Sequence, residues 1–493
     1  MMIKLFYTIH RVLGTLLSIL FFVWFVSGIV MIYHTFPRAT PNEKMEKLEP
    51  LPVSLPSVDE VLSRIPDSCM ITGMSVSNYL GQTLFEVQTD KGIIKLPADS
   101  TEEIPVINRE RINRIVKLWC NAPVASMDTL YHLDQWIPFG QLKKHFPIYK
   151  FNFTDEDKTQ IYVSSVTGDV LQCTNREERF WAWLGAIPHW VYFTQLRQDV
   201  DLWIKSVVWL SALGALMTIA GLYIGIHGYR VSRKRQGKWR SPYKKKWYYW
   251  HHVTGIIFGL FVLTWVFSGM MSLADVPGWI GKVHQEYPVR RVMNENAPQL
   301  SAYPLDYRKV IENYQGKITH MEWRHFRAIP YYQILTDNKK QTIDASSAEV
   351  TPLNLTENQI LEAVKAIHGD SVDLKGELLT EYDNYYIARS GHLPLPVWKI
   401  KVDNADKTTY YINPENGNYR DFNTHKRWGF WMYSGMHSLR IKFLIDHPVL
   451  WNIVMWTLLI GGSVVSFTGI VLGVRYLKRV ICRKRQKSKA KLQ

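Results

Sequence analysis

The chain has 493 residues, of which 47% are hydrophobic and 21% charged; this composition excludes extensive disorder and allows two to four domains. Its formal net charge of +16 raises the question of nucleic acid binding. Nine basic residues lie in 230–246, nine lie in 475–491, and Lys4 and Arg11 add two, so the remaining chain is about four units acidic. The positive charge is confined to segments beside apolar stretches, which excludes nucleic acid as its explanation and favours membrane lipid as the partner.

Four apolar stretches occur along the chain, at 12–33, 204–226, 253–273 and 449–472. Each is about long enough to cross a bilayer, and Lys205, at the edge of the second, is their only charged residue. The first stretch is too long for the apolar region of a signal peptide, so we expect a retained anchor. The basic segments predict that both termini and the middle loop are cytoplasmic and that the large domains lie on the other side of the membrane.

The sequence therefore predicts a membrane α-helical fold with four transmembrane helices and two α+β extracytoplasmic domains. In chain order we expect a cytoplasmic N-terminus with helix 1 (1–33), domain 1 (34–203), helix 2 (204–229), a basic cytoplasmic loop (230–250), helix 3 (251–273), domain 2 (274–448), helix 4 (449–474) and a basic cytoplasmic tail (475–493).

Alternating and helical patterns give the two domains their α+β character. The alternating runs at 161–168 and 410–417 each end in glycine and predict strands that enter tight turns. Further hairpins are expected at 82–95 and 331–343, and helices at 58–65, 110–119, 305–314 and 358–367.

The four cysteines, Cys69, Cys120, Cys173 and Cys482, have no CxxC spacing, which argues against an iron–sulfur or zinc site. The first three lie in domain 1, where any one pair of them is a candidate disulfide.

An internal repeat is visible without gaps. At an offset of 241, the residues His10, Gly14, Trp24, Ser27 and Gly28 match His251, Gly255, Trp265, Ser268 and Gly269. At an offset of 248, the residues Arg179, Trp183, His189 and Trp203 match Arg427, Trp431, His437 and Trp451. The soluble parts repeat at an offset of 249, for example at Pro147 and Pro396. The repeating unit is a whole transmembrane hairpin, and two parallel copies predict a pseudo-two-fold axis along the membrane normal.

Seven histidines lie at or near the predicted helix ends: His10, His34, His189, His227, His251, His252 and His437. An ionisable residue beside the bilayer core is a functional candidate, and imidazole is a common axial ligand of haem iron.

Two histidine pairs recur at equivalent positions of the repeat, His10 with His251 and His189 with His437. Residues near a two-fold axis lie close to their own copies, so the pairs predict two bis-histidine haem irons, one toward each face of the membrane. His34, His227 and His252 are alternative ligands. A single histidine at a membrane interface is more often an anchor than a ligand, but the recurrence favours ligation for the two pairs.

These residues resemble the PepSY-associated transmembrane proteins, a family that includes inner-membrane ferric-siderophore reductases. The resemblance rests on the helices that begin at His10 and His251, the strands at 161–171 and 410–421, and the segments around His189 and His437. It implies PepSY-like domains, haem b as cofactor, and a location in the bacterial cytoplasmic (inner) membrane with the large domains periplasmic. It further implies that quinol or a cytoplasmic flavoprotein donates electrons and that an iron chelate on the outer side accepts them.

Two other functions fit parts of the sequence. The soluble domains could bind a peptidase or another envelope protein and use the helices only as anchors. A small-molecule transporter fits the parallel repeat, but the helices have no intramembrane carboxylate. A ferric-chelate reductase of the haem-containing type is the preferred prediction.

Overall fold

The computed structural model describes residues 2–489, so the last four residues of the predicted cytoplasmic tail lie outside it. Four helices of the described chain are long and apolar enough to cross a membrane, which confirms the four predicted spans. They are α1 (Met2–Met31), α8 (Val200–Gln236), α9 (Lys246–Met271) and α15 (Pro448–Lys489). Both α8 and α15 continue past the predicted spans into the basic segments, where lysine and arginine, which are good helix formers, extend the helices.

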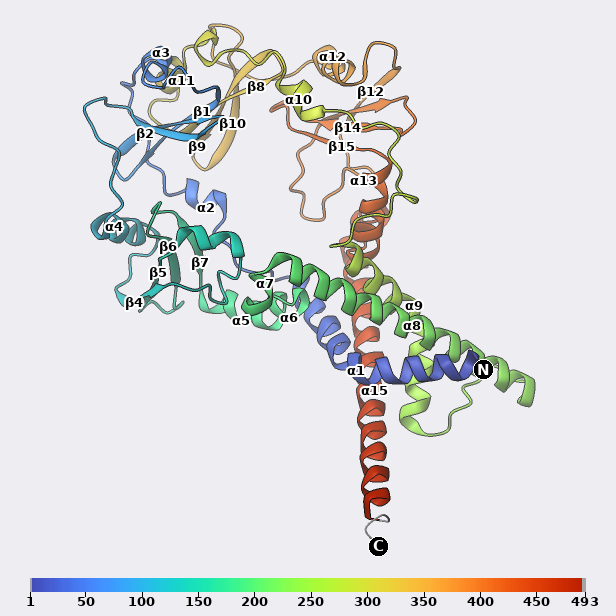
Figure 1. Cartoon of the computed structure of the whole chain (residues 1–493). Coiled ribbons are helices and arrows are strands. Elements are labelled where there is room, and N and C mark those ends of the chain that lie inside the picture. Colours follow the sequence, from blue (N-terminus) through green and yellow to red (C-terminus); the bar gives the residue numbers. More distant parts are fainter. Residues whose placement is uncertain (1, 490–493) are drawn as a thin grey trace.

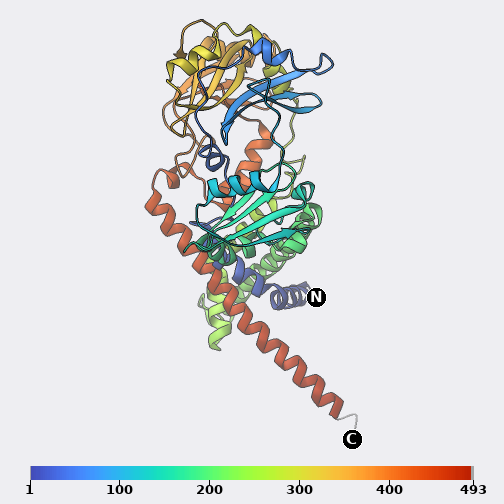
Figure 2. The same ribbon diagram turned by 90° about the vertical axis from the view of Figure 1, so that its left-hand side faces the viewer.

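The four long helices form a closed ring. Helix α1 packs against α15 and α8, and α9 packs against α8 and α15. Their shared core contains Leu17, Phe21 and Phe25 of α1 together with Val262 and Trp265 of α9. Figure 1 shows the strands gathered at one end of the molecule and the long helices at the other, and Figure 2 shows α15 extending beyond its neighbours toward the C-terminus.

The largest sheet draws its strands from both of the segments that were predicted to be extracytoplasmic. It has seven strands in the order β11-β10-β9-β8-β1-β2-β3. The first segment supplies β1 (Ile71–Tyr79), β2 (Gln82–Thr89) and β3 (Gly92–Pro97); the second supplies β8 (Ile318–Phe326), β9 (Ile329–Thr336), β10 (Lys339–Asp344) and β11 (Thr351–Pro352). Two separate domains were predicted, but the antiparallel β1–β8 pair joins their N-terminal halves, because pairing covers the edge that each half-sheet would otherwise expose.

The β1–β8 pairing is reciprocal. Met74 pairs with Trp323 and Val76 pairs with Met321, so positions 247 residues apart exchange partners across the pair. Reciprocity of this kind is the mark of a two-fold relation between two surfaces.

The C-terminal halves of the two segments form separate four-stranded sheets. One contains β4 (Val124–Leu130), β5 (Ile148–Phe153), β6 (Gln160–Ser164) and β7 (Val170–Thr174); the other contains β12 (Leu374–Leu379), β13 (Val397–Val402), β14 (Thr409–Ile412) and β15 (Tyr419–Phe422). Short helices complete the two segments and confirm their α+β character: α2 (Pro41–Met45), α3 (Val58–Leu62), α4 (Arg109–Trp119), η1 (Gly140–His145), α5 (Arg176–Leu184), α6 (Ala186–Trp190), α7 (Thr194–Arg197), α10 (Val289–Asn294), η2 (Leu300–Ala302), α11 (Tyr307–Asn313), α12 (Glu357–His368), α13 (Thr424–Gly429), the π-helix η3 (Phe430–Gly435) and α14 (Lys442–Ile445).

Each four-stranded sheet holds a half-buried carboxylate. Lys150 and Tyr162 both donate to Asp134, at 3.1 and 2.8 Å. At an offset of 249, Lys399 and Tyr411 donate to Asp383, at 2.5 and 2.8 Å. The repeat comparison of the sequence did not single out these two aspartates, because each lies in a loop far from the strand residues that it binds.

Candidate functional site

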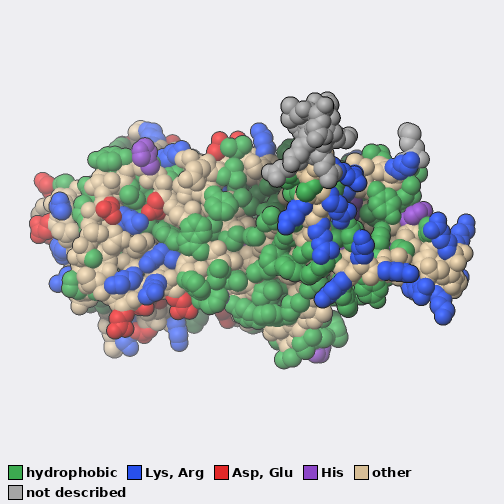
Figure 3. Space-filling model, turned by 90° about the horizontal axis from the view of Figure 1, so that it is seen from below, with side chains coloured by type: hydrophobic (Ala, Val, Ile, Leu, Met, Phe, Trp, Pro, Cys, Tyr) green, Lys and Arg blue, Asp and Glu red, His purple; other side chains and the backbone are tan. Residues whose placement is uncertain are grey.

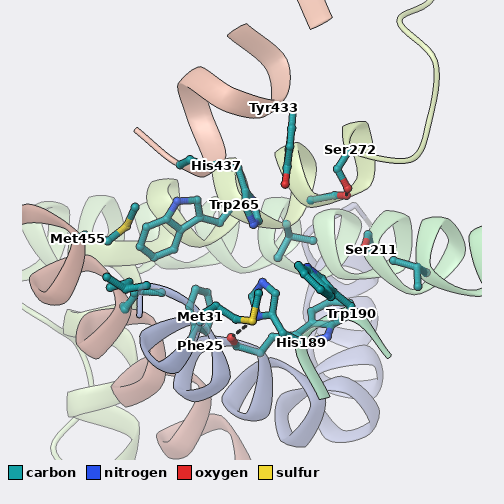
Figure 4. A pocket seen from close by; sticks show the side chains of 18 of the residues that line it. Phe25, Met31, His189, Trp190, Ser211, Trp265, Ser272, Tyr433, His437 and Met455 are labelled. Carbon is teal, nitrogen blue, oxygen red and sulfur yellow. Dashed lines mark hydrogen bonds between the residues drawn. The ribbon is translucent and has the colours of Figure 1, made fainter. Parts of the chain in front are cut away.

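The outer pair of histidines comes from two short elements above the long helices. His189 lies on α6, and His437 follows η3. Their ring centroids are 6.1 Å apart with a 59° angle between the planes, and Figure 4 shows the two side chains pointing toward one another across a pocket. Burial lowers the pKa of both imidazoles to about 4, so both are neutral, which is the form that binds a metal ion.

Each outer imidazole is anchored through Nδ1. His189 Nδ1 lies 3.1 Å from the Trp24 carbonyl oxygen, which can only accept, so the proton is on Nδ1. His437 Nδ1 lies 3.1 Å from Ser268 Oγ, and the Ser268 hydroxyl itself donates to the Trp265 carbonyl. His437 therefore also donates through Nδ1.

The inner pair lies on the long helices themselves. His10 of α1 and His251 of α9 have ring centroids 6.0 Å apart with a 37° angle between the planes. His10 Nδ1 donates to the Met217 carbonyl at 2.9 Å, and His251 Nδ1 lies 2.9 Å from Thr468 Oγ1. The Thr468 hydroxyl donates to the Val465 carbonyl, so its oxygen is free to accept from His251.

All four imidazoles thus keep Nε2 available. Among the side chains of residues 2–483 and the described backbone, no group forms a hydrogen bond with the Nε2 atom of these four histidines. Metal-binding histidines use one ring nitrogen as ligand and donate the other N–H to a carbonyl or hydroxyl. Two imidazoles on opposite sides of one metal ion, with N–metal bonds of about 2.0 Å, have ring centroids about 6 Å apart. Both pairs have this separation.

Two imidazoles are too few for a bare metal ion held by protein alone. Among the described residues no group of three or more His, Cys, Asp or Glu side chains could hold one. Structural and catalytic zinc sites use three or four protein ligands. A porphyrin supplies four ring nitrogens itself and needs only the two axial ligands that each pair offers.

Each pair opens into its own cavity. The outer cavity has a volume of about 510 Å³ and the inner cavity about 400 Å³, both within the range of small-molecule and cofactor sites. Tryptophans dominate the outer wall: Trp24, Trp190, Trp203, Trp265 and Trp451. Small residues, including Gly14, Gly221 and Gly255, open the inner one. No Asp or Glu lines either cavity within the described chain, and Phe21 is the one described side chain that lines both.

A glycine on a neighbouring helix faces each imidazole. A methyl group built at Gly28 would lie 3.5 Å from His189 Cε1, and one at Gly269 would lie 3.5 Å from His437 Cε1. In the inner pair the corresponding approaches are 2.5 Å from Gly221 to His10 Cε1 and 3.6 Å from Gly469 to His251 Cε1. Gly28 and Gly269, which recur in the repeat, and likewise Gly221 and Gly469 therefore make room for the histidine rings, most tightly at Gly221.

The structure does not bring the other three predicted ligands into the pairs. His252 lines the inner cavity, but its Nδ1 lies 2.9 Å from Ser241 Oγ and its Nε2 lies 2.9 Å from the Gly225 carbonyl, so neither nitrogen is available. His34 stacks on Trp181 at a centroid distance of 4.4 Å, and neither His34 nor His227 lines the outer or the inner cavity.

Sequence reasoning missed the groups that orient the ligands. Ser27 and Ser268 were recognised only as repeated residues, although a hydroxyl that recurs beside a histidine site was a usable signal. Thr468 and the carbonyls of Trp24 and Met217 gave none, because they lie more than a hundred residues from the histidines that they bind.

Comparison with known protein families gives one match. The family model described as the PepSY-associated TM region matches residues 7–379, which include His10, His189 and His251. No curated protein matches the chain.

Proposed function

Since the chain belongs to the PepSY-associated TM family, we propose that it is a haem-containing electron-transfer protein of the bacterial inner membrane that reduces an iron chelate on the periplasmic side. The observation that carries the proposal is the arrangement of the two histidine pairs. In each pair Nδ1 is anchored, Nε2 has no hydrogen-bond partner among the described residues, and the rings are about 6 Å apart.

His10, His251, His189 and His437 are the proposed axial ligands of two haem b groups. Haem iron, when bound, supplies the one-electron chemistry. The chain contributes the orientation of the ligands, through Ser268, Thr468 and the backbone carbonyls, and cavity walls rich in tryptophan and glycine. Burial and hydrogen bonds to the ligands are the means by which a protein sets a haem potential.

The proposed direction of transfer follows from the two-sided arrangement. Two copies of one hairpin and PepSY-like unit, related by a pseudo-two-fold axis, put one histidine pair toward each face of the membrane. The basic segments favour the inner pair as the cytoplasmic one, where quinol or a cytoplasmic flavoprotein donates electrons. The outer pair then lies on the side of the soluble domains, where the chelate accepts them.

The acceptor is tested by re-oxidation of the reduced protein. The detergent-purified protein is reduced under argon, freed of excess reductant and mixed with ferric citrate, and its absorption spectrum is followed. We expect the reduced haem bands to disappear with ferric citrate and to persist with gallium citrate, a chelate of the same charge that accepts no electron. Persistence with both chelates, in a protein that is re-oxidised by dioxygen, would contradict a ferric chelate as acceptor and leave electron transfer intact.

A further inference from the structure

Four arginines line the two cavities, two in each. Arg389 and Arg440 line the outer cavity, and Arg11 and Arg479 line the inner one. None of the four forms a salt bridge within the described residues, and neither cavity wall contains a described Asp or Glu. Each cavity therefore carries two positive charges without a protein counter-charge.

Contacts of Arg389, Arg479 and Arg11 hold these three side chains in place but leave most of their donors free. Arg389 donates to the Ile32 carbonyl at 2.9 Å and stacks over Trp451 at 4.5 Å from the ring centroid. Arg479 donates to the Tyr248 hydroxyl at 2.9 Å. Arg11 lies over Tyr476 at 4.9 Å. A guanidinium has five N–H donors in a planar fork, so each of them can still bind a carboxylate through two hydrogen bonds.

A guanidinium that lines a cavity can form charge-assisted hydrogen bonds with an anionic group of a ligand bound there. Haem b carries two propionate carboxylates, which equals the number of arginines in each cavity. We propose that Arg389 and Arg440 bind the carboxylates of the outer haem and that Arg11 and Arg479 bind those of the inner haem. This inference rests on the proposed function and adds the orientation of both haem groups.

The positions of the arginines also determine which edges of two bound haems would lie next to each other. Arg389 comes from the soluble part and is exposed, and Arg479 lies at the basic end of α15 and is exposed. With their carboxylates bound by these arginines, the two haems would direct their carboxylate edges toward opposite membrane surfaces, and Phe21, which lines both cavities, would lie between their apolar edges. Phe21 lies between the levels of His10 and Trp24 on α1, which are about 21 Å apart along a straight helix. Its ring stacks on Trp24 at 5.7 Å.

Lipid phosphates are the other source of anionic oxygens at such positions, and haem dimethyl ester separates the two. The ester keeps the iron and the ring but lacks both negative charges. Apo-protein from haem-deficient cells is titrated in detergent with haem b or with the ester, and the Soret band reports binding. The variants are R389Q/R440Q, R11Q/R479Q and the charge-retaining pairs R389K/R440K and R11K/R479K. R290Q, an exposed arginine on α10 outside both cavities, is the control.

We expect the wild type to take up two equivalents of haem b and to bind the ester at least about tenfold more weakly, since charge-assisted hydrogen bonds are lost. Each Gln pair should abolish this preference for one of the two equivalents, while the Lys pairs and R290Q retain it. Equal affinity of the wild type for haem b and ester would overturn the inference, as would a preference that persists in both Gln pairs. Failure of the folded wild type to bind haem b at all would overturn the proposed function, and the inference with it.

Discussion

The four paired histidines share one chemical arrangement. In each of them a carbonyl or hydroxyl oxygen holds Nδ1, and Nε2 has no hydrogen-bond partner among the described residues, whereas in His252 both nitrogens are bound. A histidine that only anchors a helix at the membrane surface has no need of a partner ring 6 Å away. The pairing of the rings is therefore the feature that separates ligation from anchoring.

The outer ligands can be removed one at a time. We expect His189→Ala, and likewise His437→Ala, to lose one of two haem groups while the protein remains inserted and folded. His34→Ala is the matched control, because His34 stacks on Trp181 outside both cavities. The pyridine haemochrome assay measures haem per chain. Unchanged haem content in both outer variants would remove these residues from the ligand set.

A second prediction concerns Gly221, the glycine beside His10. A methyl group at Gly221 would lie 2.5 Å from His10 Cε1, so Gly221→Ala should displace the imidazole and reduce haem content to about one per chain. Gly429→Ala is the control, because the added methyl group would meet only Val276 at an ordinary 3.8 Å and Gly429 lines neither cavity. Full haem content in Gly221→Ala would show that haem binding does not depend on the position that the His10 ring has in this structure.

At the scale of elements, the two four-stranded sheets are each tied to a neighbouring loop by one aspartate. Asp383 accepts from Lys399 of β13 and Tyr411 of β14, and Asp134 accepts from Lys150 and Tyr162 in the same way. The loop that contains Asp383 also carries Arg389. The hydrogen bonds from Lys399 and Tyr411 that hold this loop therefore also help to position Arg389 in the wall of the outer cavity.

Removal of this carboxylate should destabilise the second sheet. Asp383→Ala leaves a partly buried lysine and a buried tyrosine hydroxyl without their acceptor, which costs about 2–4 kcal/mol of unfolding free energy. Glu377→Ala on β12 of the same sheet breaks an exposed pair with Lys401 and should cost about 0–1 kcal/mol. Thermal unfolding in detergent compares the two, and equal midpoints would contradict the role of Asp383.

The sequence was a good guide to elements with strong local patterns. Four helices were predicted because some twenty consecutive apolar residues have few other structures available, and the helix at 110–119 appears as Arg109–Trp119. The β1–β8 pair was not foreseen, because its strands are over two hundred residues apart and the alternation within one strand does not name its partner.

The candidate site was predictable only in part for the same reason. The repeat predicted which histidines would meet, since symmetry converts two sequence positions into one location. The cavities, with Phe21 and the four arginines in their walls, arise from packing among the four long helices and the segments above them, which local patterns do not encode. The position of His252 next to His251 in the sequence made it a possible ligand. Only the structure shows that both of its ring nitrogens form hydrogen bonds, with Ser241 and with the Gly225 carbonyl.

At the scale of the whole molecule, positive charge is concentrated at the end formed by the long helices. Figure 3 shows lysine and arginine gathered around the ends of the long helices, beside a large hydrophobic surface. The soluble sheets lie at the other end of the molecule (Figure 1). The positive-inside rule predicts that the basic ends are cytoplasmic.

Cysteine labelling tests this orientation. Cys482 lies exposed in the basic segment of α15, and Ser54 lies exposed in the first extracytoplasmic segment. In a background without the other native cysteines, a membrane-impermeant maleimide added to spheroplasts should label Ser54→Cys and should reach Cys482 only after detergent is added. The reverse labelling pattern would show that the molecule has the opposite orientation in the membrane. The cytoplasmic and periplasmic histidine pairs would then be exchanged.

The most direct test of the account is the absorption spectrum of the detergent-purified protein before and after dithionite, with haem per chain from the pyridine haemochrome assay. The account predicts a six-coordinate b-type spectrum and about two haem groups per chain. A folded protein that contains no haem, made in cells with ample haem supply, would contradict it and favour a membrane-anchored PepSY module that binds an envelope protein or peptidase.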